Sequence, residues 1–251
     1  MLILVTNDDG IYAAGLAALY QELRGLGKVA VVAPESEQSA VGHAISLSTP
    51  LRVKKAPLAG GGFGWAVSGT PADCVKIALA ELLPAAPDLV VSGINLGPNV
   101  GINVLYSGTV SAATEAAILG VKQAVAVSLN AYKDADFATA ARVTGRLLTR
   151  MLEQPQTEPR CLNVNLPNLP ESAIKGVRLT RQDTGPLVER FDCRVDPRER
   201  VYYWLAGIND RKGLDPDTDY AALEAGYISV TPLHHDLTHY PSMQGLRGLE
   251  K

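Results

Sequence analysis

MLILVTNDDG, residues 1–10, sets the architecture of this chain. The run Leu2–Thr6 is short, apolar and unbroken, which is typical of a parallel strand buried on both faces. Two adjacent carboxylates, Asp8 and Asp9, follow Asn7 directly after this strand. Because neighbouring negative charges repel each other, the end of the strand requires a group that neutralises them.

Strand and helix signals alternate along the chain beyond this strand. The alternation predicts right-handed βαβ crossovers and an α/β fold with a doubly wound, mostly parallel, Rossmann-like sheet. In such a sheet, ligands bind beyond the carboxyl ends of the strands. The expected strands are 28–33, 88–92, 123–129 and 161–166, the expected helices are 13–26, 70–83, 109–119 and 135–152, and two extended segments are expected at 51–55 and 63–68.

The last third of the chain has a different pattern. Val177–Gln182 and Arg198–Leu205 predict a hairpin or an extended arm, and Gly226–Leu233 predicts a further strand. The acidic and polar stretch Ile208–Tyr220 predicts a loop. From these signals the arm is expected to pack either on the core or on another subunit.

The overall composition is that of an ordinary globular protein. The 251 residues are 47% hydrophobic and 20% charged, which is enough for a real core. The net charge is −3, with 23 basic and 26 acidic residues, and no basic block stands out. This balance argues against binding to a nucleic-acid polymer and leaves a small charged ligand open.

The cysteines and the apolar stretches bear on the compartment. Three cysteines lie far apart at Cys74, Cys161 and Cys193, without a CxxC motif, which favours a reducing compartment over a disulfide scaffold. The N-terminus does not have the pattern of a signal peptide. Glu115 and Lys122 interrupt the most apolar stretch, so we expect no contact with a membrane. We expect a cytoplasmic location.

Polar loops follow three of the expected core strands at their carboxyl ends. If these strands are parallel, all three loops meet at one edge of the sheet. The loops are Thr6–Gly10, Pro34–His43 and Gly93–Asn103, and the third runs on to Ser107-Gly108-Thr109 before a helix.

Four oxygen donors in these loops are suited to a metal ion. They are the carboxylates of Asp8 and Asp9, the hydroxyl of Ser39 and the amide oxygen of Asn95. A site made only of oxygens favours Mg²⁺, Mn²⁺ or Ca²⁺ over Zn²⁺. Two carboxylates with few other protein ligands fit Mg²⁺ or Mn²⁺ best, and the cation would neutralise the acid pair.

The third loop has the pattern of an anion-binding segment. Asparagines alternate with glycines over residues 95–103, so backbone N–H groups can approach a ligand closely. Ser107-Gly108-Thr109 directly precedes a helix, and helix N-termini bind phosphate through their free N–H groups and the helix dipole. A divalent cation beside a phosphate-binding loop is the arrangement for phosphoryl transfer to water.

Each of these residues also has a purely structural interpretation. Asp8 and Asp9 fit the cap of a helix that begins near Tyr12. Ser39 fits an ordinary loop serine, and His43 fits either a phosphate contact or a structural loop histidine. The three asparagines fit turns that need left-handed backbone, and the two hydroxyl residues before the helix fit N-caps.

Several sequence blocks resemble the SurE family of survival-protein nucleotidases, in the expected order over nearly the whole chain. They are "ILVTNDDGI" at 3–11, "APESEQSAVGHAIS" at 33–46, "SGTPADCVKIAL" at 68–79, "DLVVSGINLGPNVG" at 88–101, "YSGTVSAATEA" at 106–116, "LNVNLP" at 162–167, "TRQ" at 180–182 and "GYISVTPL" at 226–233.

The resemblance implies a hydrolase of the 5′-nucleotidase type, which releases phosphate from nucleoside monophosphates, with 3′-phosphates or short polyphosphate as further substrates of some members. It implies one Mg²⁺ or Mn²⁺ per subunit, held by the four oxygen donors named above. The residues expected to contact substrate or phosphate are Ser39, Asn95, Asn99, Ser107, Gly108 and Thr109.

The resemblance also implies a homodimer or homotetramer whose subunits exchange C-terminal arms. We therefore expect a single SurE-type domain over 1–251, with 183–207 as a protruding arm and 208–251 as a C-terminal segment. The stretch Asp183–Val201 is the least patterned part of this comparison.

The hypothesis for catalysis assigns different work to the two acids. Asp8 orients or deprotonates the attacking water, and Asp9 mainly holds the metal. A covalent aspartyl-phosphate is the competing route, but the first loop lacks the Asp-x-Asp spacing common in phosphatases of that type. A metal-dependent sensor module and a nucleotide-binding protein without hydrolysis remain as alternatives, and steady phosphate release would separate both from an enzyme.

Overall fold

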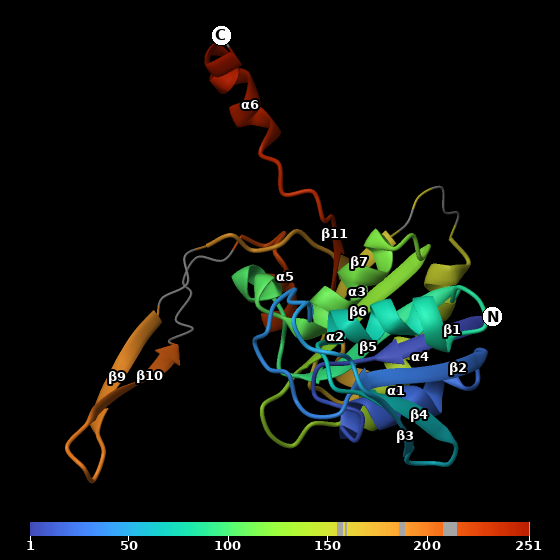
Figure 1. The fold of residues 1–251 in the computed structure, drawn as a ribbon. Helices are drawn as coiled ribbons and strands as arrows, with labels where there is room; N and C mark the ends of the chain where they lie inside the picture. Colours follow the sequence, from blue (N-terminus) through green and yellow to red (C-terminus); the bar gives the residue numbers. More distant parts are fainter. Residues whose placement is uncertain (155–157, 159, 186–188, 208–214, 251) are drawn as a thin grey trace.

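A computed structural model of the chain describes residues 1–154, 158, 160–185, 189–207 and 215–250 (Figure 1). Within these residues, one nine-stranded sheet has the strand order β3-β4-β2-β1-β5-β6-β7-β11-β8. The strands are β1 Leu2–Thr6, β2 Lys28–Pro34, β3 Val53–Pro57, β4 Phe63–Val67, β5 Leu89–Leu96, β6 Gln123–Asn130, β7 Arg160–Pro167, β8 Val177–Leu179 and β11 Ile228–Leu233.

The predicted α/β class is confirmed, because the central strands are all parallel. β4, β2, β1, β5, β6 and β7 run in one direction, while β3 pairs antiparallel with β4 at one end and β11 pairs antiparallel with β7 near the other. The carboxyl ends of β1, β2 and β5 therefore lie at the same edge, where ligands bind in sheets of this kind.

Helices cover both faces of the sheet (Figure 1). Ile3 and Val5 of β1 pack in the cluster with α1 and α4, whereas Leu4 packs in the cluster with α2 and α3. Burial on both faces explains why this strand is an unbroken apolar run. The helices are α1 Ala14–Leu23, α2 Pro71–Ile77, α3 Gly108–Ile118, α4 Phe137–Leu152, α5 Asp219–Glu224 and α6 Tyr240–Leu246.

The strand β5 is longer than the sequence pattern predicts. Its pairing with β6 shifts register after Ser92 and resumes at Asn95, so Asn95 lies in the strand and not in the loop that follows. Gly93 has φ +141°, and a Cβ there would lie 2.3 Å from the Val127 carbonyl oxygen. Only glycine fits this position. Because glycine is typical of loops, the sequence pattern predicted a loop where the strand continues.

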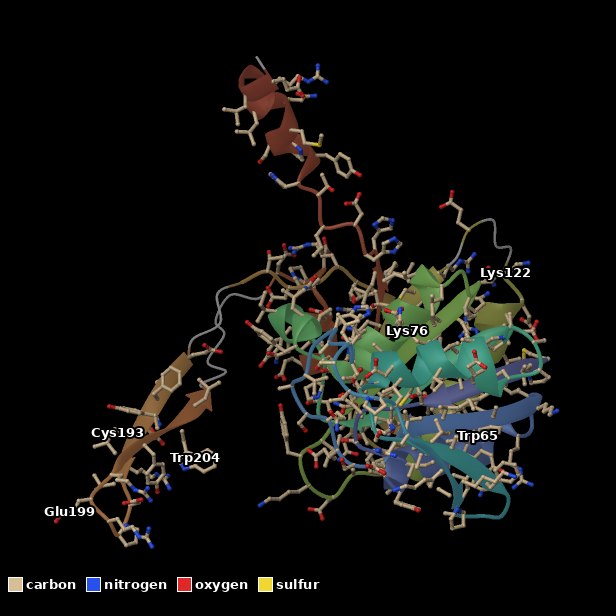
Figure 2. The ribbon with its side chains drawn as sticks, viewed as in Figure 1. Trp65, Lys76, Lys122, Cys193, Glu199 and Trp204 are labelled. Atoms are coloured by element: carbon tan, nitrogen blue, oxygen red, sulfur yellow. The ribbon has the colours of Figure 1, made fainter. Side chains whose placement is uncertain are left out.

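The predicted pairing of the arm is wrong. Val177–Leu179 joins the main sheet beside β11, and the hairpin is instead formed by β9, Glu189–Val195, and β10, Val201–Gly207. This hairpin stands away from the sheet, and Cys193 and Trp204 extend from it far from the body (Figures 1 and 2).

The segment expected to be a loop before β11 is partly helical. Thr218 caps α5, because its side chain accepts a hydrogen bond from the Ala221 N–H, and the helix begins at Asp219. Residues 208–214 of the predicted loop lie outside the described residues. In the part of the chain that the structure describes, no helix is long and apolar enough to cross a membrane.

Candidate active site

Six of the candidate residues line one cavity at the carboxyl edge of the sheet. The cavity has a volume of about 740 Å³ and lies between loops that follow β1, β2, β5 and β6. Residues from the hairpin, Glu189 and Leu205, also line it. The six candidates are Asp8, Asp9, Ser39, Asn95, Asn99 and Ser107.

Asp8 forms the buried floor of the cavity, with 7% of its surface exposed. Its carboxylate accepts a hydrogen bond from the Thr109 hydroxyl. Gly108 packs directly on it, since a Cβ at Gly108 would lie 2.8 Å from Asp8 Cβ. Burial raises the pKa of Asp8, although the hydrogen bonds from Thr109 oppose this shift. The first turn of α3 therefore holds Asp8 in place.

Asp9 lies beside Asp8, and its pKa is also raised. Its pKa is raised to about 6, first by burial and then by the charge of Asp8, although a hydrogen bond from the Leu96 N–H lowers it. In the absence of a cation, both carboxyl groups therefore keep their protons to a higher pH than free carboxyl groups do. A cation at the site would favour their charged forms.

A third acid, Glu37, joins this pair, and sequence reasoning missed it. The Ser39 hydroxyl donates a hydrogen bond to the Glu37 carboxylate. The loop that carries both residues is fixed next to the acids, because the Gln38 N–H donates to the Asp8 carbonyl oxygen at 2.8 Å. Glu37 lies in a loop without a periodic pattern. Only its position two residues before Ser39 could have indicated it as a site residue.

The side chain of Asn95 presents its oxygen as a possible metal ligand. Its Nδ2 donates to the Gly97 carbonyl oxygen at 2.7 Å, which uses the nitrogen end of the amide. The oxygen end therefore remains to coordinate a cation.

Asn99 is held rigidly from both sides. Its Nδ2 donates to Ser128 Oγ at 2.8 Å, and its N–H donates to Asn165 Oδ1 at 2.8 Å. Its carbonyl oxygen accepts from Asn163 Nδ2 at 2.7 Å and from Asn165 Nδ2 at 3.1 Å. Asn163 and Asn165 lie in the "LNVNLP" block, and their hydrogen bonds to Asn99 fix the loop that follows β5.

The residues at the start of α3 divide into two roles. Ser107 lines the cavity and also caps the helix, because its Oγ accepts from the Val110 N–H at 3.1 Å. The structural interpretation of Ser107 as an N-cap is therefore correct. Thr109 and Gly108 do not line the cavity, and both contact Asp8 instead.

The structural interpretations of the acid pair and of the loop asparagines are wrong. The N-cap of α1 is Ala13, without a side-chain cap and without an acid in the first turn, so Asp8 and Asp9 do not cap that helix. The three loop asparagines have no left-handed backbone, since the positive φ angles in this segment belong to Gly97 and Gly101.

His43 is an anchor for the loop that carries Ser39. Its Nε2 lies 2.7 Å from Glu115 Oε2, and Lys76 Nζ lies 2.8 Å from Glu115 Oε1. Glu115 is buried in α3, so this cluster ties the loop to the helix. This geometry favours the structural interpretation of His43.

The charges of the cavity decide what it can bind. Asp8, Asp9, Glu37 and Glu189 line it, and among the described residues in its walls none is a lysine or an arginine. Such walls repel a phosphate unless a cation binds with it. Nowhere in the described part of the chain do three His, Cys, Asp or Glu side chains form a metal cluster, so a cation here needs hydroxyl and amide oxygens too.

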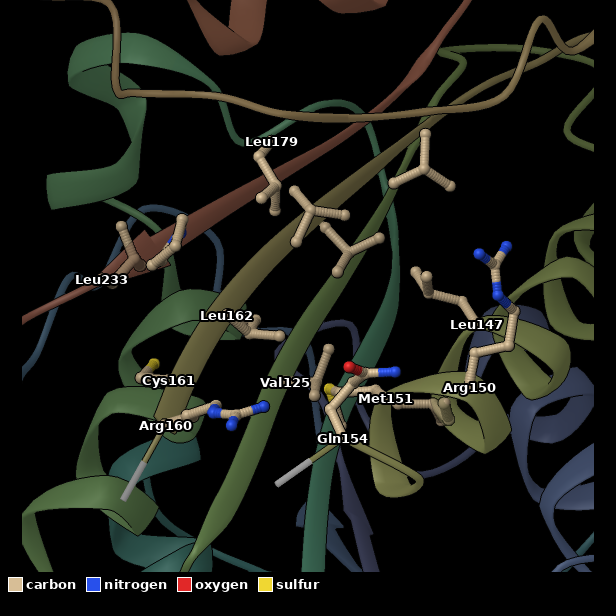
Figure 3. Close-up of a pocket in the computed structure, with 15 residues that line it drawn as sticks. Val125, Leu147, Arg150, Met151, Gln154, Arg160, Cys161, Leu162, Leu179 and Leu233 are labelled. Atoms are coloured by element: carbon tan, nitrogen blue, oxygen red, sulfur yellow. The ribbon is translucent and has the colours of Figure 1, made fainter. Parts of the chain in front are cut away.

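A second cavity, of about 720 Å³, lies at the other side of the molecule between α4 and the strands β7, β11 and β8 (Figure 3). Leu147, Met151 and Leu162 make it apolar, and its only charged lining residues within the described chain are Arg150 and Arg160. It has no carboxylate for a cation and does not compete as a metal site.

The family model described as survival protein SurE matches residues 3–187. The chain belongs to the SurE family. It is 54% identical over 98% of its length to the 5′-nucleotidase SurE of Syntrophobacter fumaroxidans, covering 98% of that protein, and 52% identical over 99% of its length to that of Syntrophus aciditrophicus, covering 94%.

A solved structure supports the same assignment. The SurE protein from Aquifex aeolicus superposes with a TM-score of 0.88 at 40% identity, and the match covers 100% of both chains. The resemblance drawn from the sequence blocks is therefore confirmed, and the fold is that of a SurE protein.

Proposed function

We propose that the chain is a metal-dependent phosphomonoesterase that hydrolyses nucleoside 5′-monophosphates, and 3′-monophosphates as secondary substrates, to nucleoside and phosphate. One observation carries the proposal: a cavity lined by acids and oxygen donors, without a lysine or arginine among its described residues, opens at the N-terminus of α3. The relatives named 5′-nucleotidase SurE support the substrate class.

The donor set fits a hard divalent cation. Asp8, Asp9, Ser39 and Asn95 would hold one Mg²⁺ or Mn²⁺ per subunit, and all four line the same cavity. When bound, the cation neutralises the acids, polarises the phosphoryl group and lowers the pKa of a water.

The protein's own residues bind and orient the phosphate. Ser107, at the start of α3, and the loop at Asn99 stabilise negative charge on the phosphoryl oxygens, while Gly108 and Thr109 act by holding Asp8. Asn99 and Ser107 line the cavity, and hydrogen bonds fix both of them before substrate arrives. The site is therefore preorganised for an anion that enters with its cation.

Asp8 is the proposed base for the attacking water. The Thr109 hydroxyl holds its carboxylate at the floor of the cavity, where the charged form can accept a proton from a water. Direct attack by water inverts the configuration at phosphorus, whereas a covalent aspartyl-phosphate retains it. We expect inversion with a chiral isotopically labelled phosphate ester.

The variant Asp8→Asn tests the proposal. We expect its kcat on nucleoside monophosphates to fall at least about 10³-fold, the range for loss of a general base, while its circular dichroism spectrum is unchanged. Asp134→Asn is the matched control, because Asp134 is an exposed loop acid outside the cavity. Near-normal turnover in Asp8→Asn would overturn the assignment.

We further propose a single SurE-type domain that acts in the cytoplasm as a homodimer or homotetramer, with the arm 183–207 as a contact between subunits. The hairpin supports this, because one of its faces is apolar and exposed. That face carries Phe191, Cys193, Val195, Val201, Tyr203 and Leu205.

A further inference from the structure

The cavity of the proposed active site has a polar floor, and its rim carries apolar side chains beside the exposed Glu37, Ser39 and Glu189. Asp8, Asn99 and Ser107 form the floor, since less than a tenth of each is exposed. The rim carries side chains that are about half exposed or more. They are Leu96 at 45%, Tyr106 at 53%, Leu205 at 57% and Tyr132 at 72%.

Tyr132 and Tyr106 are the two aromatic side chains among the described residues that line the cavity. Tyr132 packs against the end of β5, because a Cβ at Gly97 would lie 3.4 Å from its Cε1. Gly97 is itself fixed, since its N–H donates to the Leu129 carbonyl oxygen at 3.0 Å. The Tyr132 ring therefore lies near Gly97 and lines the cavity, with 72% of the residue exposed.

Tyr106 is placed by its backbone. Its carbonyl oxygen accepts from the Gly42 N–H at 3.0 Å, and its N–H donates to the Asn103 carbonyl oxygen at 3.0 Å. It immediately precedes Ser107, the N-cap of α3. Its ring therefore stands one residue away from the proposed phosphate site.

The volume of the cavity exceeds what a phosphate needs. At about 740 Å³ it lies in the range of about 300 to 1,000 Å³ for small-molecule sites, so a phosphate with its cation leaves most of it open. The open part is bounded in part by the apolar side chains of the rim, where exposed aromatic rings gain contact area when a flat ligand covers them.

We propose that Tyr132 and Tyr106 form a stacking platform for the nucleobase of the substrate. This inference rests on the proposed nucleotidase function and adds where the base binds. Stacking on aromatic rings is tolerant of base identity, because every base has a π face. The platform thus gives a preference for nucleotides over simple phosphate esters, with purines favoured over pyrimidines by their larger stacking area.

The test compares two substrates that share a phosphate ester and differ in the base. Adenosine 5′-monophosphate and ribose 5-phosphate are assayed with Mn²⁺ or Mg²⁺ on wild type, Tyr132→Ala and Tyr132→Phe. We expect Tyr132→Ala to lower kcat/KM for the nucleotide roughly 10- to 100-fold, mainly through KM, and to leave ribose 5-phosphate within about 2-fold. Tyr132→Phe keeps the ring and stays near wild type.

Tyr12→Ala is the matched control, because Tyr12 is 70% exposed and lies outside the cavity. Equal losses on both substrates in Tyr132→Ala, or no loss on the nucleotide, would overturn the platform. Failure of the wild type to hydrolyse either substrate would overturn the proposed function instead. In that case calorimetric binding of the nucleotide with Mn²⁺ still tests the platform, with a roughly 10-fold weaker Kd expected for Tyr132→Ala and an unchanged Kd contradicting it.

Discussion

At the scale of single residues, the charged forms of the acid pair destabilise the folded protein when no metal is bound. Asp8 and Asp9 both have raised pKa values, chiefly because burial disfavours charge; the charge of Glu37 adds to both shifts, and the charge of Asp8 adds to that of Asp9. A carboxyl group whose pKa in the folded state lies above its unfolded value stabilises the fold only while it is protonated. In the absence of metal, this stabilisation is complete at acid pH and disappears as the pH rises through the folded pKa.

Asp9→Asn isolates this effect, because the asparagine is uncharged at every pH. The pKa of Asp9 moves from 3.8 to about 6, so the variant and the wild type should have equal unfolding free energies below about pH 4. Above about pH 6.5, in chelator, we expect the variant to be more stable by on the order of 2 kcal/mol. Urea unfolding across this pH range measures the difference.

Added Mn²⁺ should make the wild type more stable than Asp9→Asn, because metal binding stabilises the folded wild type and the variant has lost a metal ligand. Asp134→Asn, an exposed acid, should show neither effect. Identical unfolding curves for wild type and Asp9→Asn at pH 7.5 in chelator would contradict this account of the acid pair.

The sequence predicted which residues gather at the cavity and missed the contacts that support them, for one reason. Asp8, Asp9 and Asn95 lie directly at strand ends, and parallel strands bring their ends together whatever the rest of the chain does. The contacts that fix the site are made across the fold, such as Thr109 to Asp8 and Asn165 to Asn99. Nothing in the spacing of those residues marks such contacts.

At the scale of elements, α3 is the part that links the sheet edge to the chemistry. Gly108 begins the helix and lets its backbone approach Asp8, with a further close contact to Pro71. A side chain at Gly108 would push the helix start away from the acid pair. The glycine is therefore needed for geometry and not for flexibility.

Gly108→Ala should separate stability from activity. The alanine favours the helix by up to about 1 kcal/mol, which offsets part of the strain from the contact at Asp8, so we expect a small change in Tm. We expect kcat to fall about 10-fold or more, because displacement of a positioned group by a few tenths of an ångström to 1 Å disrupts catalysis. Steady-state kinetics and thermal unfolding measure both.

Gly245→Ala provides the comparison, because a Cβ at that position in α6 has no neighbour within 4 Å. Its kcat and KM should match those of the wild type. Full activity in Gly108→Ala would show that the start of α3 does not need to contact Asp8.

The elements that could be predicted are those buried in the sheet. β1 and β2 contain continuous apolar runs because helices cover both of their faces. The hairpin strand Glu189–Val195 is exposed on both faces and has no burial pattern, so its pairing could not be read from the sequence. The helix α5 has six residues, too few for a periodic signal.

At the scale of the whole molecule, two segments leave the body of the chain. The hairpin extends to one side and α6 to another, and both expose apolar side chains (Figure 1). Contiguous exposed apolar patches often mark contact surfaces in soluble proteins. On the hairpin, Phe191, Tyr203 and Leu205 share one face, because residues that alternate along β9 and β10 point the same way, whereas Trp204, 60% exposed, lies on the opposite face.

Phe191→Ser combined with Tyr203→Ser tests whether this face joins subunits. Both side chains are at least 63% exposed, so we expect the fold to be retained. Light scattering after gel filtration should show a smaller assembly than the wild type forms. Arg194→Ser combined with Tyr202→Ser alters the opposite face and should leave the assembly intact. An unchanged mass in the first variant would remove the hairpin face from the interface.

The central claim is that the acid pair at the end of the first strand binds a cation to hydrolyse nucleotides. The most direct measurement is phosphate release from a panel of 5′- and 3′-nucleoside monophosphates, each with Mg²⁺, Mn²⁺ and chelator. We predict steady release with either metal, fastest on a 5′-monophosphate, and none with chelator. Release that persists in chelator, or no release from the folded protein with any metal, would contradict the claim.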